Sequence, residues 1–265
     1  MERADAACVP LAPRARLWWF VAPLALGAAL IALEQLTDVD RTTTRFFVDP
    51  QAHTFPLRYS FLLETVMHHW AKYAVITLGA FACAGIVFTY IVPPWKPLRR
   101  VLVFIALSMA FAPFAVEGGK AISTRHCPWD IDEFGGLVSY THLLEALPRG
   151  VQAGHCFPAG HASTGFVLMA FYFAFYALGR RRAARRALAF SVAAGLVLGF
   201  GRVLQGAYFA THVFWAGIVC WVVMLLTYRA LLAGRPLPRL RRAGAAPHRP
   251  LSPIARVIAF VSQDR

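Results

Sequence analysis

Long apolar runs, separated by basic or polar segments, dominate the chain. They cover residues 17–33, 71–92, 101–116, 161–178, 187–204 and 213–232. A helix that crosses a bilayer needs about 20 apolar residues, and these runs are close to that length. The pattern therefore predicts six transmembrane helices and an all-α, polytopic membrane protein.

The predicted spans form one membrane domain over residues 17–233. Residues 1–16 are a short polar segment, and residues 234–265 are a tail rich in Arg and Pro. No clear small-residue cleavage site follows the first run, so we interpret it as a retained helix rather than a signal peptide. The composition agrees, because only 15% of the residues are charged, against about 25% in an average soluble domain.

The net charge of +14 suggests a topology. The N-terminal segment, residues 93–100, residues 179–186 and the tail hold most of the Lys and Arg residues. Cytoplasmic loops carry such an excess, so we expect both termini in the cytoplasm. Segments 34–70, 121–157 and 205–212 then share the outer face, with a surface helix expected near Tyr59–Trp70. No basic surface interleaved with aromatic residues is visible, which argues against a nucleic-acid partner.

Two cysteines, Cys127 and Cys156, lie at the two ends of the polar segment 121–157. On the expected topology this segment faces an oxidising compartment, which permits a disulfide. Spacing along the chain does not give the distance between the two Cα atoms, so the sequence leaves the pairing open.

A turn before the fourth run, Pro158-Ala159-Gly160-His161, carries the first candidate chemistry. A helix N-terminus offers unpaired N–H groups and a partial positive charge, which attract anions. A histidine held there can protonate a leaving oxygen. Taken alone, the stretch is more typical of an ordinary Pro-Gly turn with a capping histidine.

Two more basic islands change this interpretation. Lys120 ends the third run, and Arg202 lies within the fifth. A charge at the centre of a membrane helix costs about 2.5–3.5 kcal/mol, and less near its end, so we expect Arg202 to serve a function. On the expected topology, Lys120, His161, Arg202 and His212 share one membrane face.

The order and spacing of these islands resemble the type 2 phosphatidic acid phosphatase (PAP2) superfamily, in particular a bacterial membrane branch. The family pattern is a Lys with Arg-Pro seven residues on, then Pro-Ser-Gly-His, then Ser-Arg with a His six residues after the Arg and an Asp four residues later. The corresponding stretches here are Lys120–Pro128, Pro158–His161 and Gly201–His212. The likeness covers about residues 60–230 and implies a six-transmembrane-helix bundle of PAP2 type.

The resemblance also implies roles for single residues. His161 would protonate the leaving oxygen, while Lys120, Arg125, Arg202 and the backbone of Gly160 would bind phosphate. In the family, the third-motif His attacks phosphorus to form a phospho-histidine, and the Asp orients that His. Positioning and cations at the phosphate oxygens carry such chemistry, so we expect no metal and no cofactor.

Several positions depart from the family pattern. Cys127 replaces the first-motif Arg, for which Arg125 is the candidate substitute. Ala159 and Gly201 replace serines. The largest departure is in the third motif, where Tyr208 takes the nucleophile position and His212 the Asp position.

Positions 208 and 212 are one helical turn apart and would share a helix face. We therefore expect His212 to act as a shifted nucleophile with Tyr208 as its hydrogen-bond partner. No acidic residue lies between Glu145 and Asp264. An orienting carboxylate would have to come from elsewhere, and the candidates, besides a backbone carbonyl, are Glu117, Asp130 and Asp132.

The sequence and the resemblance together imply a metal-independent phosphatase acting on a lipid phosphate or diphosphate. The active site would face the periplasm at the outer face of a bacterial inner membrane. Two alternatives stay open: a catalytically impaired PAP2-like protein that binds or moves phospholipids, and a lipid phosphotransferase. We expect His68 and His69, with Lys72, to be a satisfied interfacial pair on the outer side. A supporting position behind the site, or contact with a lipid headgroup, is the alternative. Neither the lipid nor the oligomeric state follows from the sequence.

Overall fold

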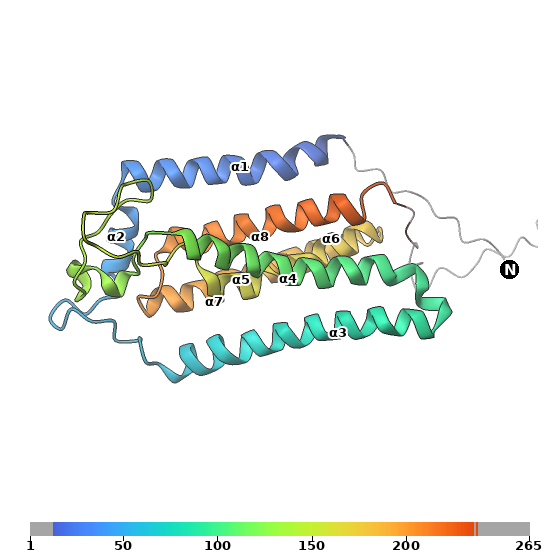
Figure 1. Cartoon of the computed structure of the whole chain (residues 1–265), viewed down its shortest axis with the longest axis horizontal. Helices are drawn as coiled ribbons and strands as arrows, with labels where there is room; N and C mark the ends of the chain where they lie inside the picture. Colours follow the sequence, from blue (N-terminus) through green and yellow to red (C-terminus); the bar gives the residue numbers. More distant parts are fainter. Residues whose placement is uncertain (1–12, 236, 238–265) are drawn as a thin grey trace, which may run out of the picture.

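Long helices that run along a common direction make up most of the chain in the computed structural model, which describes residues 13–235 and residue 237 (Figure 1). The long helices are α1 (Pro13–Leu36), α3 (Ala71–Ile91), α4 (Arg99–Ile122), α7 (Arg181–Leu204) and α8 (Ala210–Leu231). Each belongs to a helical segment that is long and apolar enough to cross a membrane. No strand occurs in the described residues, so the all-α prediction is confirmed. Most of the segment 1–16 and of the tail 234–265 lies outside the described residues.

The fourth predicted span, residues 161–178, is built from two short helices placed end to end. These are α5 (Gly160–Phe166) and α6 (Met169–Ala177). At the junction the N–H of Leu168 donates to Gly165 and that of Ala170 to Val167, which is the i→i−3 pattern of a tightened turn. At 1.5 Å per residue the pair is about 27 Å long, close to the hydrocarbon thickness of a bilayer. The six-span bundle is therefore present with one span segmented.

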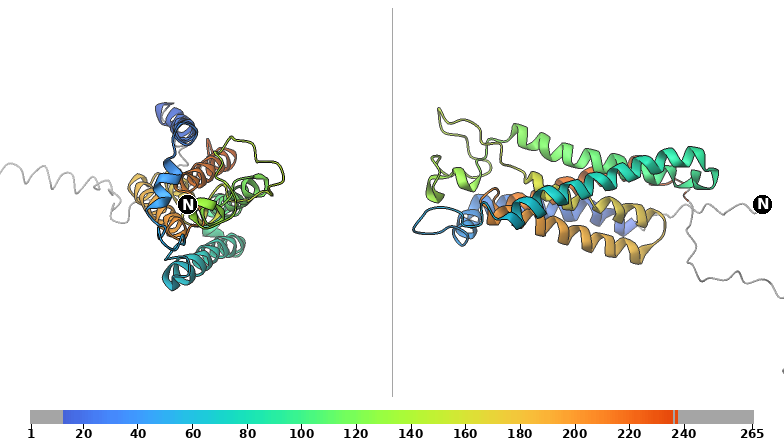
Figure 2. Two further views of the ribbon diagram at one scale, coloured as in Figure 1. Left: turned by 90° about the vertical axis from the view of Figure 1, so that its left-hand side faces the viewer. Right: turned by 90° about the horizontal axis from the view of Figure 1, so that it is seen from below.

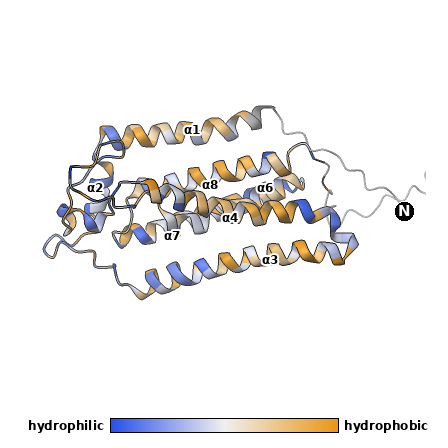
Figure 3. Cartoon of the chain, viewed as in Figure 1, coloured by the Kyte–Doolittle hydropathy of each residue, from blue (hydrophilic) through white to orange (hydrophobic). Residues whose placement is uncertain are grey.

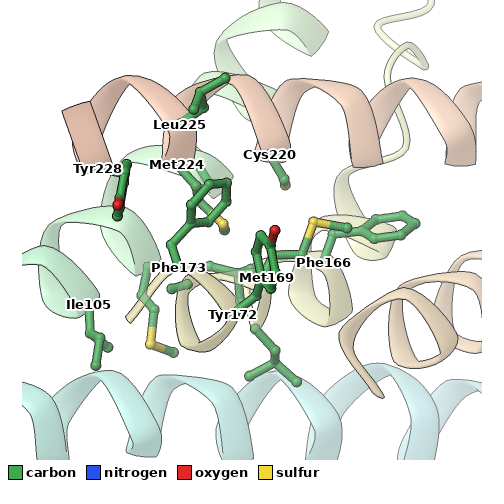
Figure 4. Packing of buried hydrophobic residues seen from close by; sticks show 14 of the residues in the cluster. Ile105, Phe166, Met169, Tyr172, Phe173, Cys220, Met224, Leu225 and Tyr228 are labelled. Carbon is green, nitrogen blue, oxygen red and sulfur yellow. The ribbon is translucent and has the colours of Figure 1, made fainter. Parts of the chain in front are cut away.

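The segmented span lies in the middle of the bundle. The side chains of α6 pack with those of α4 and α8, as the buried cluster around Phe173, Met224 and Tyr228 shows (Figure 4). On its other side α5 touches α7 directly, since a Cβ added to Gly165 would lie 2.3 Å from the backbone N of Gly195. Small residues at such crossings are typical of membrane helix packing.

The outer surfaces of the long helices are apolar. Large exposed side chains include Leu24 on α1, Phe81 and Phe88 on α3, and Phe114 on α4. Figure 3 shows apolar residues along the middle of these helices and hydrophilic residues toward their ends. This distribution suits a bundle surrounded by lipid.

Loops gather at one end of the bundle, beside the short helix α2 (Val39–Arg45) and the 3₁₀ turns Pro128–Asp130 and Asp132–Phe134 (Figures 1 and 2). The disulfide Cys127–Cys156, which the sequence left open, closes the long loop at this end with a Cα–Cα distance of 5.2 Å. The opposite end holds the turn between α6 and α7 and the 3₁₀ segment η2 (Pro93–Leu98). The predicted grouping of polar segments at one end is thus confirmed.

The surface helix expected near Tyr59–Trp70 takes another form. Residues Leu62–Trp70 form a π-helical segment, η1, that continues directly into α3. Together they make one helical stretch, Leu62–Ile91, of 30 residues. The cluster Glu64, His68 and His69 lies on this segment, so it is held against the bundle rather than along the membrane surface, and η1 contacts α7.

Candidate active site

A cavity of about 500 Å³ lies at the loop end of the bundle, between η1, α4, α5 and α7. Five of the seven residues that the sequence singled out line it: Lys120, Gly160, His161, Arg202 and Tyr208. The remaining lining residues are His68, Lys72, Pro113, Glu117, Cys127, Trp129, His155, Ser163, Thr164 and Ala207. Three motifs far apart in the sequence therefore meet at one hollow.

Close backbone contacts bring Lys120 and His161 to the same place. A Cβ added to Gly160 would lie 2.4 Å from Oε1 of Glu117 and 3.3 Å from Cδ of Lys120. One added to Gly119 would lie 2.9 Å from Cδ of Pro158. The proline ring leaves room only for glycine at position 119, so Gly119 allows the loop before α5 to approach the last turns of α4.

Three cationic side chains line the cavity, Lys72, Lys120 and Arg202, and the last two are paired with carboxylates. Lys120 Nζ lies 3.6 Å from Glu117 Oε2. Arg202 donates from Nη1 to Glu64 Oε2 at 2.7 Å and to Gln205 Oε1 at 2.8 Å. The buried Nε of Arg202 makes no hydrogen bond to any described residue. The contacts from Nη1 fix the guanidinium before any anion enters the cavity.

A second imidazole lies against His161. The rings of His68 and His161 have centroids 3.9 Å apart, and His68 Nδ1 lies 3.5 Å from Glu64 Oε1. His69 stacks on the outer side of His68 at 4.8 Å and does not line the cavity. The expectation that His68 is only an interfacial residue is therefore wrong. In the sequence, the four-residue spacing of Glu64 and His68 could have predicted this role, because it places both side chains on one helix face.

Comparison with known families agrees with this arrangement. A model of the PAP2 superfamily matches residues 101–235, just over half of the 265 residues. The chain belongs to the PAP2 superfamily. No curated protein and no solved structure matches it. The PAP2 match contains Lys120, His161 and Arg202, and it leaves out Glu64 and His68, which lie earlier in the chain.

Arg125, expected to bind phosphate in the first PAP2 motif, does not line the cavity. Helix α4 ends at Ile122, and the backbone of Ser123 is extended, so Arg125 lies in the loop beyond the helix. The guanidinium of Arg125 is buried and donates to the carbonyl oxygens of His142 and Glu145 and to Thr141 Oγ1. Burial lowers the pKa of Arg125. These contacts give the residue a structural place in the loop.

His212, expected as a displaced nucleophile, also lies outside the cavity wall. The reason is that α8 begins at Ala210 after an extended Phe209, so Tyr208 and His212 do not share a helix face. The imidazole of His212 is 1% exposed, and its Nδ1 lies 3.1 Å from the carbonyl oxygen of Cys156. Phe157 and Phe209 pack against its ring.

The carboxylates beside His212 are Glu34 and Asp40, not the expected Glu117, Asp130 or Asp132. The ligand-type atoms of Glu34, Asp40 and His212 lie within 4.8 Å of one another, and all three residues are buried. Such a set can hold a divalent cation, but none of the three lines the cavity. Asp40 instead accepts hydrogen bonds from the N–H and the hydroxyl of Thr211, and burial raises the pKa of Asp40 to about 6.

Proposed function

We propose that this PAP2 protein is a metal-independent phosphatase that removes phosphate from a lipid phosphate or diphosphate. One observation carries the proposal: Lys120, Arg202 and two histidines from different helices share a single cavity. Phosphoryl transfer requires cations at the phosphate oxygens, a nucleophile and an acid for the leaving oxygen. The cavity wall offers each of these groups.

Lys120 and Arg202 are the proposed phosphate ligands. Arg202 lines the cavity with its guanidinium fixed by Glu64 and Gln205. A donor that is held in place before the substrate binds stabilises the transition state without reorganising. Lys120 supplies a second positive charge from the end of α4.

His68 is the nucleophile that the geometry favours. Its Nδ1 lies 3.5 Å from Glu64 Oε1, so a carboxylate is close enough to orient the ring, and Nε2 is the proposed attacking atom. In this step the Nε2–P bond forms, the bond from phosphorus to the lipid oxygen breaks, and His161 gives its proton to that oxygen. A water molecule then hydrolyses the phospho-histidine and restores both imidazoles.

The two rings touch in the structure, and this contact sets a condition on the mechanism. The attacking and leaving atoms lie on opposite sides of phosphorus. Rings with centroids 3.9 Å apart leave no room for a phosphoryl group between them. We propose that the side chain of His68 turns away from His161 when the phosphate group binds.

The lipid and the membrane face are supported by the surroundings of the cavity. Its walls belong to helices whose outer faces expose large apolar side chains, such as Trp70 on η1 and Phe114 on α4. A hydrocarbon tail can therefore lie in the bilayer while the phosphate lies in the cavity. The disulfide Cys127–Cys156 at this end, and the arginines at the other, favour an outer, periplasmic site in a bacterial inner membrane.

The proposal is tested with purified protein in detergent, by following phosphate release from a panel of lipid phosphates and diphosphates with a chelator present. We expect release by the wild type, and loss of release in His161→Ala, His68→Ala and Arg202→Ala without loss of folded protein. A phospho-histidine intermediate is labile in acid, whereas a phosphotyrosine on Tyr208 is stable. An acid-stable intermediate that disappears in Tyr208→Phe would overturn the assignment of His68.

One observation favours a second function, the binding of phospholipids without turnover. Tyr208 lines the cavity at the position where the resemblance places the family nucleophile. Lipid phosphate that binds to the wild type and is never hydrolysed, under any chelator or metal condition, would select this function.

A further inference from the structure

A second, larger cavity of about 890 Å³ lies on the far side of the bundle from the loops, and the function proposed above does not use it. Four arginines, Arg180, Arg181, Arg182 and Arg186, lie at its mouth. Its wall is formed by aromatic and aliphatic side chains of α3, α6 and α7, with Phe171, Phe175 and Phe190 among them. The cavity therefore combines a strongly basic mouth with an apolar wall.

Among the described residues, no carboxylate neutralises Arg182 or Arg186, since none lies within salt-bridge distance of either. The sequence has no Asp or Glu between Glu145 and Asp264. Arg181 stacks over the ring of Tyr176, with its Cζ 3.4 Å from the ring centroid. An anion from outside the described residues can therefore pair with Arg182 and Arg186.

The shape of the cavity matches a lipid rather than a soluble anion. Its lining extends from Leu168, at the start of α6, to Gly179 at the end of the span. Eleven steps at about 1.5 Å per residue separate these two positions, a distance of about 16 Å along the span. A small anion would use only the arginines, whereas a phospholipid can place its phosphate at the arginines and an acyl chain along the phenylalanines.

The placement of individual arginines separates a binding site from a simple excess of positive charge on the cytoplasmic side. Arg182 and Arg186 are one helical turn apart, and both line the cavity. All three arginines are exposed, but Arg185, from the same cluster, does not line the cavity. A topology signal alone gives no reason for this difference.

We propose that this cavity binds an anionic phospholipid, with its phosphate held by Arg182 and Arg186 and one acyl chain against Phe171, Phe175 and Phe190. Arginine forks bind phosphate oxygens in pairs. Basic pockets between transmembrane helices are known to hold anionic headgroups. The site is separate from the cavity of Lys120 and His161, so it stands whether or not the proposed hydrolysis occurs.

The test is native mass spectrometry of the full chain in neutral detergent, titrated with phosphatidylglycerol or with phosphatidylcholine. We expect phosphatidylglycerol to bind at least tenfold more tightly than phosphatidylcholine. We also expect its affinity to fall at least tenfold in the double variant Arg182→Gln/Arg186→Gln. The matched control Arg100→Gln/Arg185→Gln removes two exposed arginines from the same end of the bundle and should bind like the wild type.

Three results would overturn the proposal: equal loss in both double variants, equal binding of the two lipids, or full displacement of phosphatidylglycerol by glycerol phosphate, which would identify a soluble anion. If the double variant does not fold, the single variants Arg182→Gln and Arg186→Gln replace it. Each should lower the affinity for phosphatidylglycerol, by less than the double variant. Because the readout is lipid binding, failure here leaves the phosphatase proposal unaffected.

Discussion

Two adjacent glycines near the end of α4 offer a controlled test of how the active site is assembled. A Cβ added to Gly118 meets nothing within 4 Å, whereas one added to Gly119 lies 2.9 Å from Cδ of Pro158. Both substitutions to alanine gain about 1 kcal/mol of helix propensity. Only Gly119→Ala forces a clash, and the proline ring cannot rotate out of the way.

The expected magnitudes follow from these contacts. Overpacking of this kind costs about 1–3 kcal/mol, so Gly119→Ala should be about 1–3 kcal/mol less stable than Gly118→Ala. For a chain of this size, each kcal/mol shifts Tm by about 2–4 °C. Gly119 precedes Lys120, and Pro158 lies three residues before His161. A shift approaching 1 Å between them can lower kcat/KM by about 100-fold.

The assay is thermal unfolding and phosphate release of both variants in the same detergent. Gly118→Ala should melt at or above the wild-type Tm with wild-type activity, and Gly119→Ala should lose both stability and activity. Equal behaviour of the two variants in both measurements would show that α4 and the loop before α5 do not approach each other as the structure has them. The positioning of Lys120 and His161 described above would then be refuted.

Three further predictions test the nucleophile, the buried carboxyl and the disulfide. His68→Asn should lower kcat by about 10³-fold or more in a steady-state assay. His69→Asn, on the same segment but outside the cavity, should keep kcat within about threefold of the wild type. Comparable losses of kcat in the two variants would contradict the role of His68. Burial raises the pKa of Asp40 to about 6. The ionised form therefore destabilises the fold increasingly as pH rises from about 4 to 6. Acidification from pH 7 to pH 5 should raise the free energy of unfolding by about 1 kcal/mol. In Asp40→Asn, Tm should change less between pH 7 and pH 5 than in the wild type. An unchanged dependence of Tm on pH would mean that another group causes it. The disulfide Cys127–Cys156 closes a loop with a sequence separation of 29, so its reduction should lower the stability by about 2–5 kcal/mol and lower Tm. The variant Cys127→Ser/Cys156→Ser should show the same lower Tm, and reductant should not change the Tm of this variant. If reductant leaves the wild-type Tm unchanged, the disulfide does not stabilise the fold.

The apolar runs were sufficient to predict the bundle, because lipid requires each span to satisfy its backbone within a helix. The hydropathy pattern does not predict the break between α5 and α6 at Val167 and Leu168. The side chains there stay apolar, and only the backbone hydrogen bonds change to the tighter i→i−3 pattern. The stretch Leu62–Trp70 was misjudged for a related reason. Its mixture of polar and apolar residues suits a surface helix and a span that reaches the site equally well.

The predicted site residues divide according to whether their position depends on the exact residue where a helix stops or starts. Lys120, His161 and Arg202 lie in terminal turns of helices that converge at one end, so motif and span boundaries sufficed to group them. Arg125 and His212 depend on where a helix stops or starts. A difference of two residues at α8 removes His212 from the face assumed for it, and helix boundaries are the least certain feature of a sequence.

The site joins two parts of the chain that contribute different chemistry. The region matching the PAP2 superfamily supplies the cations and the proposed acid, which is enough to bind a phosphate group. The imidazole with a carboxylate partner, His68 beside Glu64, comes from η1, before that region. Binding and turnover should therefore be separable. His68→Asn should keep the affinity for a lipid phosphate within about threefold while losing turnover, because Lys120 and Arg202 are untouched. A parallel loss of affinity would mean that His68 acts on phosphate binding and that attack comes from another group on the cavity wall.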